Sequence, residues 1–233
     1  MRLSIFMAIF LNKLLVYRHN KQAYKPTMRH KRLKACTTRH PLLEKCANEI
    51  GHAYEIIRNT FAEGGRLLIC GNGGSAADAD HIAGELLKGF DSDRQLNPQW
   101  QEKLGKELAS NLQTGLPVIP LTGFNAFNSA FANDCDGKYN FAQLTFSLGQ
   151  SGDTLLAIST SGNSENILHA ARTAKSMDMS VIGLTGESGG QLLALTETCI
   201  CAPAKIVWEI QELHLPIYHA LCLMLEDYFF EEA

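Results

Sequence analysis

The stretch RLLICGNGGSAADADHIAGELLKGF, residues 66–90, decides the fold class of this chain. Its apolar start, residues 66–70, predicts a strand buried in a parallel sheet. A glycine-rich turn follows, and a helix is expected from about residue 75 to residue 88. The stretch therefore predicts one strand-turn-helix unit.

The same unit recurs toward the C-terminus. Strand signals lie at residues 117–122, 154–159 and 180–185, with a weaker one at 197–201. Helical periodicity lies around and between them, at residues 41–62, 125–132, 138–148, 164–175, 190–195 and 206–230. This alternation predicts an α/β fold, a doubly wound parallel sheet flanked by helices. Ligands of such folds bind beyond the carboxyl ends of the strands.

Composition and charge exclude several classes of protein. The 233 residues are 45% hydrophobic and 19% charged, which is ordinary for a globular chain. Residues 1–40 hold ten of the 21 Lys and Arg and no acid, which leaves 11 basic against 24 acidic side chains elsewhere. This acidic main part argues against nucleic-acid binding. The apolar residues 3–11 are too few to span a membrane, and seven cysteines without a CxxC pair favour a reducing cytoplasm.

Two segments stand apart from the predicted sheet. Residues 1–30 are a basic and apolar extension. It is either a non-native or over-extended start, with the chain proper beginning near Met28, or a targeting segment. Residues 31–233 are expected to form a single domain. Within it, residues 91–115 form a polar excursion with a short helix at about 99–112.

The first turn, CGNGGS at residues 70–75, is named the glycine loop here. Its backbone N–H groups can turn toward an anion. With Ala76, the loop also fits the glycine/alanine variant of the dinucleotide fingerprint, so a nicotinamide cofactor is one alternative. No isolated acidic residue for a ribose follows a second strand about 20 residues on, and this weakens the alternative.

The turn STSGNS at residues 159–164, named the serine loop, follows the strand at residues 154–159. Four hydroxyls lie where a helix is expected to begin, and hydroxyl donors, free amides and the helix dipole together favour a phosphate. A helix cap made by Ser164 alone is the simpler alternative. Because the loop has no lysine, it is not a nucleotide P-loop. A small molecule that carries a phosphate monoester is the better ligand.

Two helices carry further candidate side chains. His81 and Glu85 are four residues apart and share one face of the helix after the glycine loop. Gln211 and His219 are eight residues apart and lie on roughly one face of the C-terminal helix, which Pro216 is expected to bend. Taken alone, the first pair is typical of a surface contact and His219 of a core histidine.

Together, CGNGGS and STSGNS resemble the sugar isomerase (SIS) domain, and more closely the family of phosphoheptose isomerases, from about residue 40 to the C-terminus. HIAGE at residues 81–85 and QELHLPIYH at residues 211–219 are similar to the family's HxxxE and Q(x7)H helices. The resemblance implies a flavodoxin-like three-layer sandwich. It also implies a homotetramer with sites at subunit interfaces.

The resemblance further implies a role for each matching residue. Glu85 would be the general base and His219 the general acid. A divalent zinc would be held by His81, Glu85, Gln211 and His219. The substrate would be contacted by Asn72, Gly73, Gly74, Ser75, Glu85, Gln211, Asn133 and Asp134, and its phosphate by Ser159, Thr160, Ser161 and Ser164.

The implied reaction interconverts D-sedoheptulose 7-phosphate and D-glycero-D-manno-heptose 7-phosphate through an enediol. The alternative is a non-catalytic SIS module that binds a phosphosugar or a protein partner, of the regulatory or replication-initiator-associating type. Such modules lack the acid/base pair, so Glu85 and His219 favour the enzyme. One departure from the family is the long segment between Gly89 and Pro117, which leaves the length of the sugar open. Asp134 could also be an ordinary solvated acid.

Overall fold

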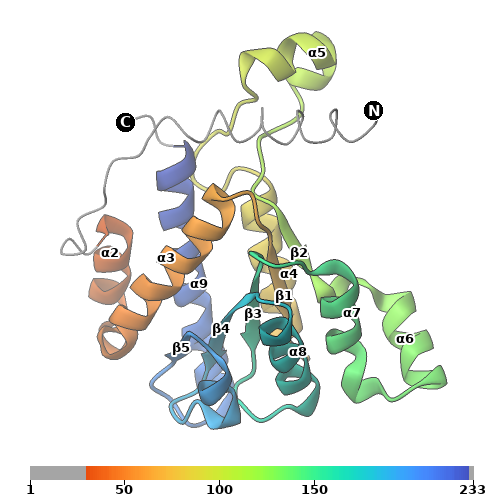
Figure 1. The fold of residues 1–233 in the computed structure, drawn as a ribbon. Helices are drawn as coiled ribbons and strands as arrows, with labels where there is room; N and C mark the ends of the chain where they lie inside the picture. The colour runs from red at the N-terminus through yellow and green to blue at the C-terminus, as the bar shows by residue number, and fades with distance from the viewer. Residues whose placement is uncertain (1–29, 231–233) are drawn as a thin grey trace.

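The computed structural model describes residues 30–230, and its core is a five-stranded, all-parallel sheet (Figure 1). The strand order is β2-β1-β3-β4-β5. The chain leaves β1 toward β2 on one side and then continues from β3 on the other, so the order reverses between β1 and β3. This is the flavodoxin-like order, which places a ligand crevice at that reversal. The strands are β1 (Leu67–Cys70), β2 (Val118–Pro120), β3 (Thr154–Ile158), β4 (Ser180–Thr185) and β5 (Thr198–Cys201).

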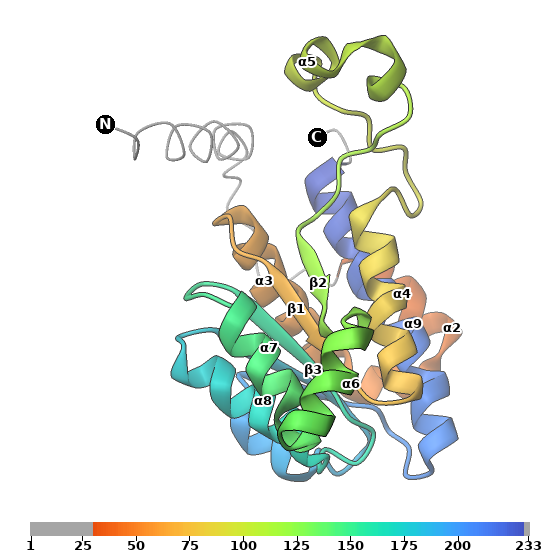
Figure 2. The ribbon, with the colours of Figure 1, turned by 90° about the vertical axis from the view of Figure 1, so that its right-hand side faces the viewer.

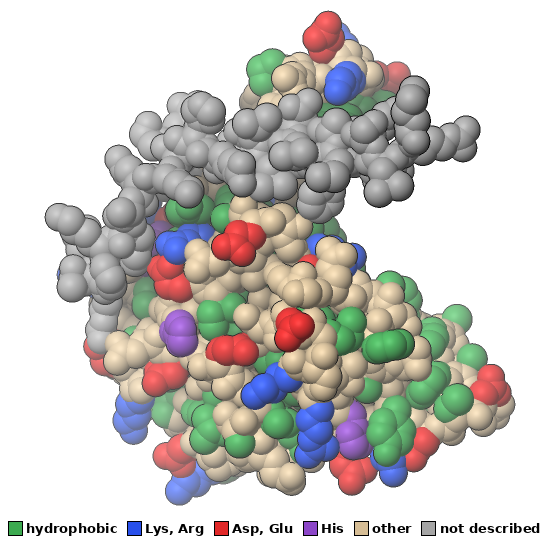
Figure 3. Space-filling view, in the orientation of Figure 1, with side chains coloured by type: hydrophobic (Ala, Val, Ile, Leu, Met, Phe, Trp, Pro, Cys, Tyr) green, Lys and Arg blue, Asp and Glu red, His purple; other side chains and the backbone are tan. Residues whose placement is uncertain are grey.

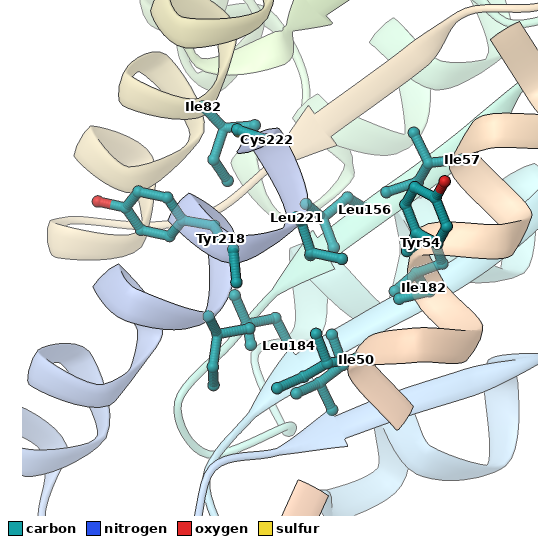
Figure 4. Close-up of a cluster of buried hydrophobic side chains, with 14 of the residues drawn as sticks. Ile50, Tyr54, Ile57, Ile82, Leu156, Ile182, Leu184, Tyr218, Leu221 and Cys222 are labelled. Carbon is teal, nitrogen blue, oxygen red and sulfur yellow. The ribbon is translucent and has the colours of Figure 1, made fainter. Parts of the chain in front are cut away.

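Helices cover both faces of the sheet, which confirms the predicted doubly wound α/β fold. Alternate residues of β1 enter different cores: Leu67 and Ile69 pack with one set of helices, Leu68 and Cys70 with the other. The first core lies under α3 (Ala47–Ala62), α4 (Gly74–Leu87) and α9 (Val207–Phe230). The second lies under α7 (Asn140–Leu148) and α8 (Glu165–Ser176). Figure 4 shows the first core, where Ile57 of α3 lies toward the strand residue Leu156 and Ile50 of α3 lies beside Leu184.

The predicted helix at residues 41–62 is divided. Residues Pro41–Cys46 form a 3-10 helix, η1, and α3 follows from Ala47. Cys46, with φ −121° and ψ 17°, lies outside the α region and separates the two. A helix that the sequence analysis did not predict, α2 (Lys31–Arg39), precedes them and packs on α9. Its buried apolar residues are only Leu33 and Cys36, three residues apart. Two positions are too few to give a helical periodicity that the sequence analysis could detect.

Helix α6 (Asn125–Asp134) and the 3-10 helix η4 (Gly190–Leu195) follow the prediction closely. Two 3-10 helices do not: η2 (Leu121–Gly123) replaces the end of the strand predicted at residues 117–122, and η3 (Gly137–Tyr139) replaces the start of the helix predicted at residues 138–148. Helix α9 continues through Pro216 without interruption from residue 207 to residue 230. No helix among residues 30–230 is long and apolar enough to cross a membrane. The predicted extension at residues 1–30 lies outside the described residues, except for its last residue.

The polar excursion projects away from the sheet (Figure 2). It carries α5 (Pro98–Ala109), none of whose residues is buried. Asn97 caps this helix by accepting a hydrogen bond from the backbone of Trp100. At the base of the excursion, by contrast, the side chain of Arg94 is fully buried and forms an ion pair with Glu226 of α9, at 2.8 Å. The excursion is therefore anchored at its base and exposed at its tip.

Candidate active site

The glycine loop and the serine loop leave the carboxyl ends of β1 and β3, on either side of the point where the strand order reverses. The glycine loop requires its glycines. Gly73 has a φ of +56°, which favours glycine, and a Cβ on Gly71 would lie 2.4 Å from the carbonyl oxygen of Ser75. The two loops therefore lie at the edge of the sheet where this fold class binds ligands.

Asparagine side chains connect the two loops. Asn72 of the glycine loop and Asn166 of α8 exchange two hydrogen bonds, of 2.8 and 2.9 Å. Asn166 also donates to Asn140 of α7, at 3.4 Å. These bonds hold the backbone of the glycine loop beside the first turn of α8, so both loops can contact one ligand.

The serine loop keeps its hydroxyls away from the helix backbone. Ser164 is the N-cap residue of α8, but its side chain makes no capping hydrogen bond. Its hydroxyl instead lies 3.1 Å from that of Ser159. The backbone turns at Gly162, with φ +64°, and Thr160 accepts a hydrogen bond from the N–H of Gly186. Ser164 therefore does not cap the helix through its side chain, as the simpler alternative expected, and phosphate binding by the loop stays a prediction.

Three predicted site residues on two helices form an acid–base cluster, namely His81 and Glu85 of α4 and His219 of α9. Nε2 of His81 lies 3.1 Å from Oε1 of Glu85 and 3.5 Å from Nε2 of His219. The 15% exposed side chain of Glu85 also forms an ion pair through Oε2 with Lys88, at 3.1 Å. A carboxylate and two imidazoles thus lie close together at a partly exposed site. Acid–base catalysis requires such groups within reach of a substrate.

Burial, and then the neighbouring His81, lower the pKa of His219 below its ordinary value, against the opposing charge of Glu85. The ring of Phe90 lies 5.2 Å from the ring of His219 and contributes to this apolar surrounding. His219 therefore carries less positive charge at neutral pH than an exposed histidine does.

Gln211 lies beside the glycine loop. A Cβ on Gly74 would come within 2.4 Å of the Gln211 Nε2 atom, so glycine is what permits this close approach. The polar edge of α9 thus faces the glycine loop at Gln211 and the acid–base cluster at His219. Gln211 and His219, the two predicted site residues of α9, thus both face the candidate site.

Asn133 and Asp134 are placed differently from the other predicted residues. They lie at the end of α6, are exposed, and share a hydrogen bond of 2.9 Å with each other. Helix α6 packs mainly on η3 and α7, not on α4 or α9. Within the single chain, the described residues thus provide no contact between this pair and the acid–base cluster.

Two residues near the cluster were missed by the sequence analysis. The phenol oxygen of Tyr218 lies 3.0 Å from Nδ1 of His81, and Asp78 lies beside the same phenol. Asp78 precedes His81 by three residues and Glu85 by seven, so the three share a helix face. That spacing is a signal in the sequence, whereas the arrival of Tyr218 depends on how α9 packs on α4.

The implied zinc ligands are assembled in part. The two separations from His81 Nε2 suit neighbouring ligands, because bonds of about 2.0–2.1 Å to a tetrahedral zinc place ligand atoms roughly 3.3–3.4 Å apart. Imidazole, carboxylate and amide donors also suit zinc in type. Among residues 30–230, however, no group of three or more His, Cys, Asp or Glu side chains is placed to hold a metal ion. The donors fit, but the described side chains do not complete a site.

Comparison with known proteins identifies the class of this site. Residues 34–114 and 113–186 match the SIS domain family. A solved phosphoheptose isomerase from Neisseria gonorrhoeae superposes with a TM-score of 0.68 at 26% identity, over 95% of this chain and 97% of that one. One from Francisella tularensis gives a TM-score of 0.69 at 32% identity, over 82% and 92%. The fold is thus that of an SIS domain.

The relatives narrow this class further. The phosphoheptose isomerase of Thiobacillus denitrificans (strain ATCC 25259 / T1) is 41% identical over 179 residues, 76% of this chain and 81% of the relative. That of Roseiflexus sp. (strain RS-1) is 38% identical over 178 residues, with the same coverage. The chain belongs to the phosphoheptose isomerase family, an isomerase family, and the resemblance stated from its motifs is confirmed.

Proposed function

We propose that this protein is a phosphosugar aldose–ketose isomerase that converts D-sedoheptulose 7-phosphate to D-glycero-D-manno-heptose 7-phosphate through an enediol. The observation that carries the proposal is that Glu85 and His219 both approach His81, at 3.1 and 3.5 Å, beside the two loops. The names of the relatives support a heptose phosphate as substrate.

Each part of the site has a task in this reaction. The serine loop binds the phosphate through its hydroxyls and the first turn of α8. The glycine loop and Gln211 hold the sugar beside the cluster. Asn133 and Asp134 remain proposed contacts to sugar hydroxyls. Because they are remote from the cluster within one chain, that role requires either movement of α6 or a site shared between subunits.

Glu85 and His219, on either side of His81 in the acid–base cluster, carry out the proton transfers. Glu85 removes a proton from the carbon beside the carbonyl, and the Lys88 ion pair on its second oxygen keeps the carboxylate in place. His219 acts as the general acid toward the oxygen of the enediol. Since its pKa is lowered, the neutral imidazole is its main form near pH 7, and a neutral N–H can still donate to a developing oxyanion.

We propose zinc as the cofactor, with His81, Glu85, Gln211 and His219 as its ligands. When bound, zinc supplies a Lewis acid that polarises the carbonyl. The donor types and the two separations from His81 support this assignment. A tightly held Glu85 would be a weaker base, so its two roles belong to separate steps. Metal content of the purified protein, measured by mass spectrometry, tests the assignment directly.

We also propose a homotetramer with sites near subunit interfaces. Figure 3 shows hydrophobic side chains gathered over the region of α6 and α7, and Phe146 there is 67% exposed. Exposed apolar surface of this kind is typical of subunit contacts. Native mass spectrometry measures the stoichiometry, and a monomer at micromolar concentration would contradict it.

The test of the function is conversion of sedoheptulose 7-phosphate to its aldose, followed by NMR. Glu85→Gln keeps the shape of the side chain but removes the base, so turnover should fall at least about 100-fold. Glu107→Gln, on the exposed helix α5, is the matched control and should retain full turnover. Saturable binding of the sugar without conversion by the unaltered protein would favour the non-catalytic alternative.

A further inference from the structure

Two thiols of the edge strand β5 share one hydroxyl of the neighbouring strand β4, and the proposed reaction uses none of the three. Cys199 and Cys201 are two residues apart, so both side chains project from the face of the sheet opposite to Ile200 of the first core. Their Sγ atoms lie 3.5 and 3.6 Å from Oγ1 of Thr185. Cys199 is 6% exposed, whereas Cys201 is partly exposed at the end of the strand. A buried thiol and an accessible thiol therefore surround one hydroxyl.

The hydrogen bonds around Thr185 favour a negative sulfur on Cys201. The carbonyl oxygen of Gly186 also lies 3.0 Å from this hydroxyl, but it already accepts a hydrogen bond from the N–H of Gly189. The single proton of the hydroxyl is thus available to the sulfur of Cys201, while its oxygen accepts the proton of the Cys199 thiol. Each donor in this chain then has one acceptor, and the chain ends on the sulfur of Cys201.

The pKa values of the two thiols are shifted in opposite directions. The neighbouring Cys199 lowers the pKa of Cys201 to about 6, and Thr185 adds to this effect, whereas burial and the charge of Glu49 on α3 oppose it. Cys201, followed by burial, raises the pKa of Cys199, which keeps its proton at neutral pH. Because the thiolate is the nucleophilic form of cysteine, Cys201 is the reactive member of the pair.

Cys201 also contacts the turn that packs on the serine loop. A Cβ on Gly189 would lie 3.3 Å from Sγ of Cys201, so the thiol and the turn are neighbours. On its other side the turn meets the serine loop, where a Cβ on Gly162 would lie 2.0 Å from the carbonyl oxygen of Gly189. The N–H of Leu192 donates to the carbonyl oxygen of Gly162 at 3.0 Å. A shift of Cys201 toward the turn would therefore move the serine loop.

We propose that Cys201 is a peroxide-reactive thiol with Cys199 as its resolving partner, and that the disulfide between them displaces the turn at Gly189 and weakens phosphate binding by the serine loop. The effect on phosphate binding rests on the proposed function, whereas the thiol chemistry does not.

The chemistry takes two steps. The Cys201 thiolate attacks one oxygen of hydrogen peroxide, the O–O bond breaks, and a sulfenic acid and a hydroxide ion form. The sulfur of Cys199 then attacks the sulfenic sulfur, the S–O bond breaks, and the thiol proton leaves with the hydroxyl group as water. The two sulfurs together lose two electrons, and the peroxide takes them up.

The disulfide is within reach of the strand, but only at the long limit. Two residues of a strand span about 6.4–6.8 Å between their Cα atoms, and disulfides join Cα atoms about 4.4–6.8 Å apart. Closing the bridge therefore distorts β5, which pairs with β4 at the edge of the sheet. Disulfides closed under strain are readily reduced, so the modification should be reversible.

The direct test treats the full-length protein with one equivalent of hydrogen peroxide at neutral pH, removes the excess with catalase and alkylates the remaining thiols with iodoacetamide. Mass spectrometry should show the peptide with both cysteines unalkylated and lighter by two hydrogen atoms, and dithiothreitol should restore it. Cys199→Ser should leave a sulfenic acid on Cys201, which dimedone traps. Thr185→Val should slow the oxidation about 10-fold, since a hydrogen bond to a charged group is lost. Cys135→Ser removes an exposed thiol outside the pair and is the matched control, with the bridge forming at an unchanged rate.

Hydrogen exchange reports the displacement without any sugar. Backbone N–H groups of residues 159–164 and 189–192 should exchange faster in the oxidised protein, and peroxide should leave their exchange unchanged in Cys201→Ser. In turnover, oxidation should raise KM for the sugar phosphate about tenfold with little change in kcat, because contacts to the phosphate are lost. Cys201→Ser should keep the KM of the untreated protein in the presence of peroxide.

Either of two results would overturn the proposal. One is the absence of the bridge in the peroxide-treated, unaltered protein. The other is a bridge that leaves hydrogen exchange in the serine loop unchanged. A protein that forms the bridge and loosens the loop, but converts no sugar phosphate, would retain the modification site and refute the proposed function.

Discussion

The buried ion pair between Arg94 and Glu226, at the base of the polar excursion, predicts how much stability the protein loses when one partner is removed. The side chains of Arg94 and Glu226 are 0% and 1% exposed. Glu226 accepts three hydrogen bonds of 2.8 Å, from Arg94 and from the backbone N–H groups of Phe90 and Asp91. Burial opposes the charge on Glu226, but these bonds together lower its pKa, so it stays ionised beside Arg94.

Arg94→Met would leave that carboxylate buried without its cation. Breaking a buried pair from one side costs about 3–5 kcal/mol, so the free energy of unfolding should fall by this amount. Arg94 also donates to the carbonyl oxygens of Leu86 and Glu85 at the end of α4. The variant should therefore loosen the turn of helix that carries the proposed base, and lower turnover as well.

Urea unfolding followed by circular dichroism measures the cost. The double variant Arg94→Met/Glu226→Met removes both charges and should recover most of the lost stability, because replacing a whole buried pair by apolar residues is often neutral. Lys138→Met breaks an exposed pair with Asp136 and should leave the urea midpoint almost unchanged. A cost below about 1 kcal/mol for Arg94→Met, or a double variant less stable than the single one, would refute the reasoning.

Three further predictions concern pH, the serine loop and a glycine. His214 is fully buried, and burial lowers its pKa from 6.5 to about 4. As the pH falls, His214 takes up its proton in the unfolded chain before it does so in the folded one. The free energy of unfolding should therefore fall by about 3 kcal/mol as the pH drops from 6.5 toward 4. In urea unfolding, His214→Gln should remove this part of the pH dependence. Ser164→Ala should raise KM for the sugar phosphate about tenfold with little change in kcat, since a hydrogen bond to a charged group is lost; an unchanged KM would exclude Ser164 from the phosphate site. Gly162→Ala should lower the Tm, because φ is +64° and the added Cβ would lie 2.0 Å from the carbonyl oxygen of Gly189, whereas Gly84→Ala, with open space around it, should keep or raise it.

The sheet could be predicted from the sequence because its strands are apolar runs bounded by turn signals. All four residues of β1 and all five of β3 are buried, as strands covered on both faces must be. The two loops were predicted for the same reason, since they begin where these runs end. Helix α2 was missed because only a few of its nine residues are apolar and buried, which gives no periodic signal.

The site was predictable where it depends on spacing within one helix. His81 and Glu85 meet because they are four residues apart. The contacts of Tyr218 and of Arg94 depend instead on the packing of α9 against segments more than 100 residues away in sequence. No pattern in a single sequence records such distances, and a buried arginine in a polar stretch is the opposite of what composition predicts.

The central claim is that Glu85 moves a proton to and from the carbon beside the carbonyl of a sugar phosphate. It is tested most directly by incubating the protein with sedoheptulose 7-phosphate in deuterated water and following the product by NMR. We predict an aldose that carries deuterium on the carbon beside its carbonyl, and neither product nor deuterium uptake above background with Glu85→Gln. Because Glu85 can return the same proton to the neighbouring carbon, the label is at least partial, and the contradicting result is conversion or deuterium uptake by Glu85→Gln equal to that of the unaltered protein.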